Sequence, residues 1–272
     1  MVDNTMRGAV DRATNSTAFE NTARIGYGVS GVLHLLIAYI VVRLAFGAGG
    51  NADQSGALAT LAAQPGGAVA LWVTAVGLAA LALWRLAEAV VGSHPNESGR
   101  QDDGAKMSFK RLKSVSLALV YFGVALTAVR FATGAGKSNG AQNAGLTARL
   151  LQSGWGKTLL LGAAVVIVAV GGYHVYKGLS KKFEKDLKVS GGTLVTTLGM
   201  TGYAAKGLVL AGAGVLLVIA TLTADPAKGA GLDAAVKSLG NAPFGKFLLI
   251  AAAIGFAAYG AYCFVLGRFA RM

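Results

Sequence analysis

The side chains most able to do chemistry in this sequence are the polar and ionisable residues that interrupt its long apolar runs. Arg85 and Glu88 are oppositely charged and three residues apart, a spacing that places both on one face of a helix. His34 and His174 lie within apolar runs, and Tyr121 falls near the position of His34 when the runs are aligned. Ionisable residues in such runs are often functional, because a charge is costly to bury in hydrocarbon. These five residues form our candidate intramembrane polar site.

Each member of this candidate site also has a structural explanation. Arg85 and Glu88 can pair, and they lie close enough to one end of their run for their side chains to reach the lipid head groups. A site repeated by symmetry would need His in several runs, so for His34 we favour a hydrogen bond to a neighbouring helix. A haem held by two histidines has no further ligand pattern to support it. We place Lys177 and Lys206 near one membrane surface, and expect no lysine or carboxylate at the middle of the membrane.

Sequence patterns typical of enzymes are missing. The single cysteine, Cys263, has no disulfide partner. Two glycine-rich segments, Gly47–Gly50 and Gly134–Gly136, each follow a long apolar run and lack the GxxxxGK[ST] arrangement of a phosphate loop, so we interpret them as helix C-caps. HExxH and paired-carboxylate motifs do not occur either. We therefore expect a protein that is not an enzyme and has no metal or cofactor.

The elements that position these residues are membrane-spanning helices. The chain has 272 residues, of which 54% are hydrophobic and only 14% charged, against about a quarter charged in soluble proteins. Its apolar runs are about 20 residues long, enough for a helix to cross the hydrocarbon. We expect six spans at Gly26–Gly47, Ala68–Val91, Ser114–Thr133, Thr158–Leu179, Tyr203–Thr223 and Phe247–Gly267. The expected fold class is an all-α polytopic membrane protein.

The net charge of +13 raises the question of a nucleic-acid partner, but the basic residues fall between apolar runs and not on one face with interleaved aromatics. Fourteen Lys and Arg residues flank the spans on the side of both termini, and six flank them on the other side. The positive-inside rule then predicts cytoplasmic termini in the cytoplasmic membrane. The internal loops form two basic clusters for which we expect anionic lipid as a partner: Lys106, Lys110, Arg111 and Lys113, and Lys181, Lys182, Lys185 and Lys188.

Comparison of the sequence with itself reveals three tandem copies of one unit. Gly67, Gly156 and Gly245 are each 89 residues apart, and the same offset aligns Trp84, Tyr173 and Tyr262. Each unit holds two spans, so the copies insert in the same orientation. We expect a rotation of about 120° around the membrane normal to relate the three helical hairpins, with pseudo-threefold symmetry. The three aromatic rings should then lie at one depth. The expected organisation is a cytoplasmic segment at 1–21 and repeats at 22–95, 107–183 and 193–272.

A short amphipathic segment precedes the second span of each unit. These segments have apolar residues at helical spacing, and we expect each to form a helix at the outer interface: Ala57–Ala63, Ala144–Gln152 and Leu232–Leu239. Small residues recur at helical spacing on the second spans, among them Gly77 and Gly255. Close packing of helix backbones explains them better than a pore lined by small residues.

These repeat residues resemble a known family. Arg24, Gly26 and Tyr27 with Gln64-Pro65-x-Gly67 and Trp84-Arg85-Leu86-x-Glu88 look like the repeat of a domain of unknown function that occurs in triplicate in bacterial, especially actinobacterial, membrane proteins. The second copy departs from the pattern, with Lys113-Ser114 in place of Gly-Tyr and His174 in place of Arg. The resemblance implies an architecture but no activity.

Two classes of function remain. The first is a structural or accessory subunit, or a membrane-organising protein, whose small-residue faces pack on partner helices and on lipid. The alternative is a channel or facilitator for a small neutral or apolar solute along the pseudo-threefold axis. Polar residues around a continuous void on that axis would favour permeation, whereas interdigitated Leu and Val would favour the structural class, to which we lean.

Overall fold

The computed structural model describes residues 17–91, 104–188 and 192–271, where the regular structure is helical apart from one β-bridge between Leu187 and Ala270. The long helices are α2 (Thr17–Ala45), α4 (Gly67–Val91), α5 (Gly104–Ala132), α7 (Gly154–Leu179), α8 (Gly192–Thr223) and α10 (Gly245–Phe269). The shorter elements are α3 (Gln54–Ala62), α6 (Asn139–Leu151), α9 (Leu232–Gly240) and the 3-10 turns η1 (Lys182–Asp186) and η2 (Pro226–Gly229).

The six long helices are all long and apolar enough to cross a membrane, which confirms the expected polytopic all-α fold. The three short amphipathic segments are also helical, as α3, α6 and α9. Helix boundaries on the side of the termini extend further than we expected, and α8 begins at Gly192 instead of Tyr203. Hydropathy marks the part of a helix that crosses hydrocarbon, whereas the backbone hydrogen bonds continue beyond it.

The two glycine-rich segments are helix C-caps, as expected. Gly47 and Gly134 have φ values of 80° and 78°, the left-handed conformation that glycine adopts most easily. The next residue in each segment donates its N–H five residues back, from Ala48 to Arg43 at 2.9 Å and from Ala135 to Arg130 at 2.8 Å. This is the hydrogen-bond pattern of a Schellman motif. The same cap therefore ends the first span of repeats one and two.

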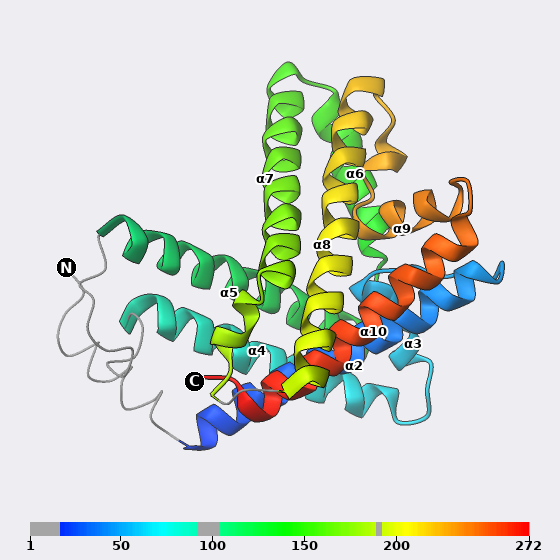
Figure 1. The fold of residues 1–272 in the computed structure, drawn as a ribbon. Helices are drawn as coiled ribbons and strands as arrows, with labels where there is room; N and C mark the ends of the chain where they lie inside the picture. The colour runs from blue at the N-terminus through cyan, green and yellow to red at the C-terminus, as the bar shows by residue number, and fades with distance from the viewer. Residues whose placement is uncertain (1–16, 92–103, 189–191, 272) are drawn as a thin grey trace.

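The main helix pairs connect different repeats. Helix α4 packs along α5, α7 along α8, and α10 along α2, so the second span of each repeat lies against the first span of the next. The α7–α8 pair and the α4–α5 pair run in clearly different directions (Figure 1). This cyclic pattern of pairs is what three tandem repeats around one axis would produce.

Contacts within a repeat are less extensive, and in the described part of one repeat the two spans barely touch. Helix α2 packs on α4, and α8 packs on α10, but among the described residues α5 and α7 make no comparable contact. The spans therefore form an open ring in the order α5, α4, α2, α10, α8, α7. The two spans of the second repeat are therefore not packed against each other as a hairpin, and the expected pseudo-threefold symmetry is not confirmed.

Close backbone approach at small residues holds the main pairs together. A Cβ on Gly31 would lie 2.9 Å from the carbonyl oxygen of Gly260, and a Cβ on Gly171 would lie 2.7 Å from that of Gly207. These two contacts occupy equivalent positions in their repeats. The third equivalent pair is Ala82 on α4 and Ala118 on α5, each 2% exposed. A small residue on each helix at the crossing permits this packing, as expected for helices in lipid.

The sequence of repeat two explains why the ring is open. In repeat one, Gly26 faces Gly77, and a Cβ on Gly26 would lie 2.4 Å from the Gly77 carbonyl oxygen. The equivalent residues of repeat three, Gly202 and Gly255, also line the interface between their two spans. In repeat two these positions are Lys113 and Val166, both exposed. Their bulk prevents the close approach that two glycines allow.

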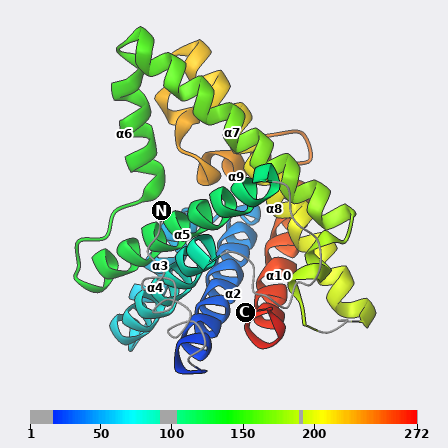
Figure 2. The same cartoon turned by 90° about the vertical axis from the view of Figure 1, so that its left-hand side faces the viewer.

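The linking helix of repeat two is also longer than its counterparts. Helix α6 has 13 residues, whereas α3 and α9 have 9 each, and four more residues add about 6 Å of helix. Figure 2 shows α6 leading from the end of α5 to the start of α7. The longer helix thus separates the two spans that it connects.

The short helices tie the repeats together on the side opposite the termini. The N–H of Ala52, just before α3, donates to the carboxylate of Asp233 in α9 at 2.8 Å. The N–H of Asn139 at the start of α6 donates to the hydroxyl of Ser55 in α3 at 2.9 Å. Each bond joins two repeats, so the three short helices form a polar bracket across the bundle.

Candidate functional site

The first polar cluster lies where α4 meets α2 and α5. Arg85 pairs with Glu88 at 2.7 Å, as the spacing of the two residues predicted. Arg85 also donates to the hydroxyl of Tyr27 on α2, and Ser114 on α5 donates to Glu88 at 3.3 Å. Tyr121 on α5 lies close enough to Tyr27 and Arg85 to interact with them electrostatically. The cluster connects three spans from two repeats.

The second cluster occupies the equivalent place between α7 and α8. Lys177 pairs with Asp186 of η1 at 2.5 Å, donates to the Tyr203 hydroxyl at 3.2 Å and lies 4.7 Å from the centre of that ring. His174 packs against the same ring at 5.8 Å between centroids. Lys177 corresponds to Glu88 in the repeat, so the polar position is kept while its charge is reversed.

His34 lies elsewhere, between α2 and α10. It is 6% exposed, and its Nδ1 is 2.7 Å from the Ser30 carbonyl oxygen of its own helix. The expected hydrogen bond to a neighbouring helix is therefore wrong, because the carbonyl one turn back meets the Nδ1 position. His34 contacts the neighbouring helix through its ring, at 4.7 Å from the Tyr259 centroid and 6.5 Å from that of Phe256.

Lys206 lies deeper in the bundle than the sequence suggested. Its ammonium is 4.0 Å from the centre of the Tyr259 ring, and Tyr259 is ten residues before the end of α10 at Phe269, about 15 Å along the helix. In the described part of the chain it has no carboxylate partner. Because its side chain packs on an aromatic ring of the neighbouring helix, Lys206 is held within the bundle between α8 and α10.

The five predicted residues therefore do not form one site. Arg85, Glu88 and Tyr121 come together, whereas His34 and His174 lie at two other helix interfaces. Sequence reasoning missed the tyrosines that receive the cations, Tyr27 and Tyr203, and the Asp186 partner of Lys177. Tyr27 and Tyr203 occupy equivalent positions in repeats one and three. The recurrence of this tyrosine was the sequence signal that could have identified it as the partner of a basic residue.

The aromatic residues that align between repeats are not equivalent in their surroundings. Trp84 and Tyr262 are 5% and 0% exposed, whereas Tyr173 is 40% exposed. Tyr262 donates to the Phe183 carbonyl at 3.1 Å. Two of the three rings are thus core residues on the side of the termini, and only Tyr173, beside the gap in the ring, remains accessible to lipid.

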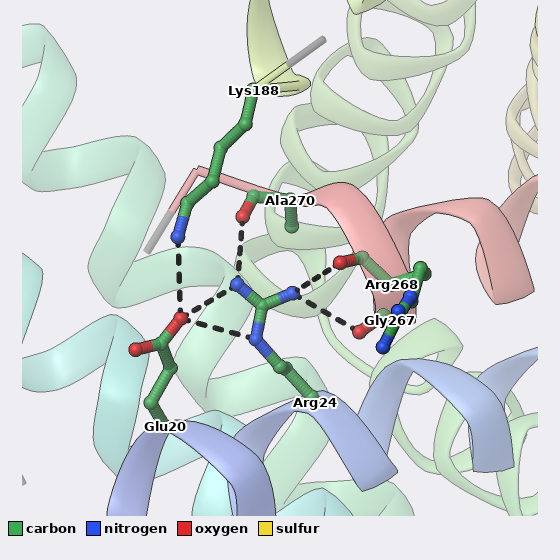
Figure 3. A network of polar contacts seen from close by, with 6 residues as sticks. All are labelled: Glu20, Arg24, Lys188, Gly267, Arg268 and Ala270. Carbon is green, nitrogen blue, oxygen red and sulfur yellow. Dashed lines mark hydrogen bonds and ion pairs between the residues drawn. The ribbon is translucent and has the colours of Figure 1, made fainter. Parts of the chain in front are cut away.

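A further polar network closes the bundle on the side of the termini (Figure 3). Arg24 of α2 donates to the carbonyl oxygens of Gly267, Arg268 and Ala270 at 3.0–3.1 Å, which are free at the C-terminal end of α10. Arg24 also pairs with Glu20 at 2.6 Å, and Glu20 in turn pairs with Lys188 at 3.3 Å. This network, which we call the Arg24 clasp, joins repeat three to repeat one.

The basic residues proposed to bind lipid differ in their availability. Arg111, Lys113, Lys181 and Lys185 are exposed. Lys182 donates to the Tyr176 hydroxyl at 2.6 Å, and Lys188 belongs to the Arg24 clasp. The side chains of Lys106 and Lys110 lie outside the described residues.

Together, these clusters are ion pairs and cation–aromatic contacts between helices. The observations define the class of protein, a polytopic α-helical membrane protein with three tandem repeats. The chain belongs to the family Domain of Unknown Function (DUF1206), whose model matches residues 25–92, 112–181 and 201–270. These intervals lie within or close to the repeats expected at 22–95, 107–183 and 193–272.

A curated relative aligns with nearly the whole chain. The "Uncharacterized protein YxxB" of Bacillus subtilis (strain 168) is 28% identical over 256 residues, covering 92% of this chain and 90% of the relative. The actinobacterial emphasis of the sequence resemblance is not confirmed by this Bacillus protein. No solved structure matches the chain.

Proposed function

We propose that this protein is a non-enzymatic, membrane-organising or accessory protein that packs on lipid and on a partner span through the edge left open between α5 and α7. The observation that carries the proposal is this open edge. Only 17% of the most apolar stretch of α5, and of α7, is buried, against 50–56% for α2, α4 and α10. Two spans of one bundle thus offer most of their surface to the membrane.

The packing of the ring interior supports this class of function over permeation. Side chains from all three repeats meet there in one apolar cluster, which includes Ile37, Val41, Ala128, Val209 and Phe256. Interdigitated apolar side chains of this kind hold helices together and offer a solute no polar lining. The polar clusters join neighbouring spans by ion pairs and hydrogen bonds, which is a structural role and fits an accessory protein without chemistry of its own.

The proposal includes a membrane orientation and a lipid preference. We place both termini in the cytoplasm of a bacterial cell, on the basis of the basic residues that flank the spans on that side. The exposed cations Arg111, Lys113, Lys181 and Lys185 would then face the anionic lipids of the cytoplasmic leaflet.

Photo-crosslinking from the open edge tests the proposal. A photoreactive amino acid at Val166, which faces the gap, should give a discrete protein adduct in native membranes. The matched control is Val165, which is 66% exposed and whose repeat equivalents Val76 and Ile254 are 59% and 60% exposed, as expected of lipid-facing positions. Lipid adducts alone at both positions would contradict a partner span at this edge.

A further inference from the structure

An apolar cavity lies on the half of the bundle opposite the termini. The cavity has a volume of ≈ 380 Å³ and lies between α6, α7 and α8, in the range of about 300–1,000 Å³ typical of small-molecule sites. Its walls are mostly leucine, with Leu150 from α6, Leu160 and Ile167 from α7, and Leu210 and Leu217 from α8. It lies beside spans that are surrounded by hydrocarbon.

The cavity lies beside the second span of repeat two. The repeat equivalents of Ile167 are Leu78 and Phe256, which are 2% and 1% exposed in the common core, and those of Leu160 are Leu71 and Leu249, at 1% and 4%. In those copies the remainder of the ring covers this face of the second span. In repeat two Leu160 is also buried, at 5% exposed, in a small apolar cluster with Ala164 and Leu217, and the cavity lies beside this cluster.

The hydroxyl of Thr147 is a polar group in the cavity wall. Thr147 of α6 is 3% exposed and lines the cavity, yet within the described residues its hydroxyl makes no hydrogen bond. Helical threonines elsewhere in the chain bond the carbonyl four residues back, as Thr74 and Thr221 do at 2.8 Å. The hydroxyl opens onto the cavity, so Thr147 offers a hydrogen-bond donor to a ligand with an oxygen acceptor at one end.

We propose that this cavity binds one acyl chain of a membrane phospholipid from the leaflet opposite the termini, with an ester oxygen at Thr147. The acyl chain of the lipid lies along the apolar residues of α7 and α8 towards Ile167. A phospholipid fits because its acyl chains are the apolar groups that surround these spans. Its ester carbonyl, at the polar end of the acyl chain, can accept a hydrogen bond from the Thr147 hydroxyl. The side chains that line an empty apolar cavity lack van der Waals contacts on their cavity side, and a bound hydrocarbon chain supplies those contacts.

Native mass spectrometry tests the proposal. The purified protein is reconstituted into phosphatidylethanolamine–phosphatidylglycerol vesicles and then extracted again with detergent for the measurement. We expect one phospholipid to remain bound to the unmodified protein after detergent washing. Ala163→Phe, which fills the cavity from an exposed position on α7, should lower the bound fraction at least fivefold, and Thr147→Val should lower it about threefold. The matched control Val165→Phe, on the lipid-facing side of α7, should leave it unchanged.

Two results would overturn the proposal. One is the absence of retained lipid on the unmodified protein, and the other is equal retention by Ala163→Phe and Val165→Phe, which would indicate lipid bound only around the outside. Thermal stability in detergent confirms that each variant is folded, and Leu160→Trp provides a second way to fill the cavity. The inference is independent of a partner span: retained lipid without a protein adduct at Val166 would uphold it and contradict the proposed function.

Discussion

At the scale of single residues, the contacts that matter most are those that a cation makes across a helix interface. Arg85 and Glu88 were predictable, because both lie on one helix three residues apart. The third partner, Tyr27, was not predictable, since it comes from another helix whose rotation the sequence does not specify. The partner of Lys177 was not predicted either, because Asp186 lies nine residues away in a turn beyond the helix.

The Arg24 clasp predicts a specific loss of stability. Arg24→Ala removes three hydrogen bonds to free carbonyls at the end of α10 and should destabilise the protein by about 2 kcal/mol, because bonds to a charged donor are each worth more than neutral ones. Thermal unfolding in detergent measures the effect. Arg268→Ala is the control, since Arg268 is exposed and enters the clasp only through its backbone carbonyl. Equal stability of the two variants would contradict this role.

The exposed lysines make a second prediction at this scale. Replacing Lys181 and Lys185 with Gln should reduce retention of anionic phosphatidylglycerol, because each cation near an anionic surface contributes about 1 kcal/mol. Native mass spectrometry with mixed lipids measures the retention. The comparison is Lys188→Gln, whose side chain is already paired with Glu20 and which should have a smaller effect. Unchanged retention in the double variant would leave these charges a topological role only.

At the scale of helices, apolar length predicted all six spans, and amphipathic spacing predicted α3, α6 and α9. Small residues predicted close packing but not which helices would meet, because the repeat pattern is equally consistent with packing inside a unit or between units. The structure places the main pairs between units. The departure of repeat two was visible in the sequence as Lys113, yet its consequence required knowing that the equivalent glycines face each other.

Two neighbouring glycines on α7 test this account of helix packing. Gly171 lies against α8, where backbone atoms of Ala211 and Gly207 are 2.5–2.7 Å from the position that a Cβ would occupy, whereas a Cβ on Gly172 would have nothing within 4 Å. Gly171→Val should therefore separate α7 from α8 and destabilise the protein by about 1–3 kcal/mol, as overpacking does. Gly172→Val should be nearly neutral. Thermal unfolding measures the stability of the two variants. A similar loss of stability in both would show that valine destabilises the α7 helix itself and not its interface with α8, which would contradict this account.

At the scale of the whole molecule, the arrangement of spans predicts which loops share a side of the membrane. Cysteines at Asn51, Lys137 and Lys228 should react with an impermeant thiol reagent added to intact cells, and cysteines at Lys185 and Arg268 should react only after the membrane is opened. The native Cys263 is buried, so its background should be low. The reverse labelling pattern would invert the proposed orientation, and a mixed pattern would contradict six spans.

The central claim is that the three repeats form a ring that is open between α5 and α7, and disulfide trapping tests it most directly. With Cys263→Ser as background, a cysteine at Gly77 lies near Ile25, whose Cγ2 is 3.4 Å from the Cβ that Gly77 would carry. The repeat-two equivalents are Leu112 and Val166, which are 64% and 61% exposed. We expect Ile25→Cys with Gly77→Cys to form a disulfide in oxidised native membranes, and Leu112→Cys with Val166→Cys to form none, because a disulfide needs Cα atoms within about 7 Å. Efficient trapping of both pairs would mean that the ring is closed and would contradict the account.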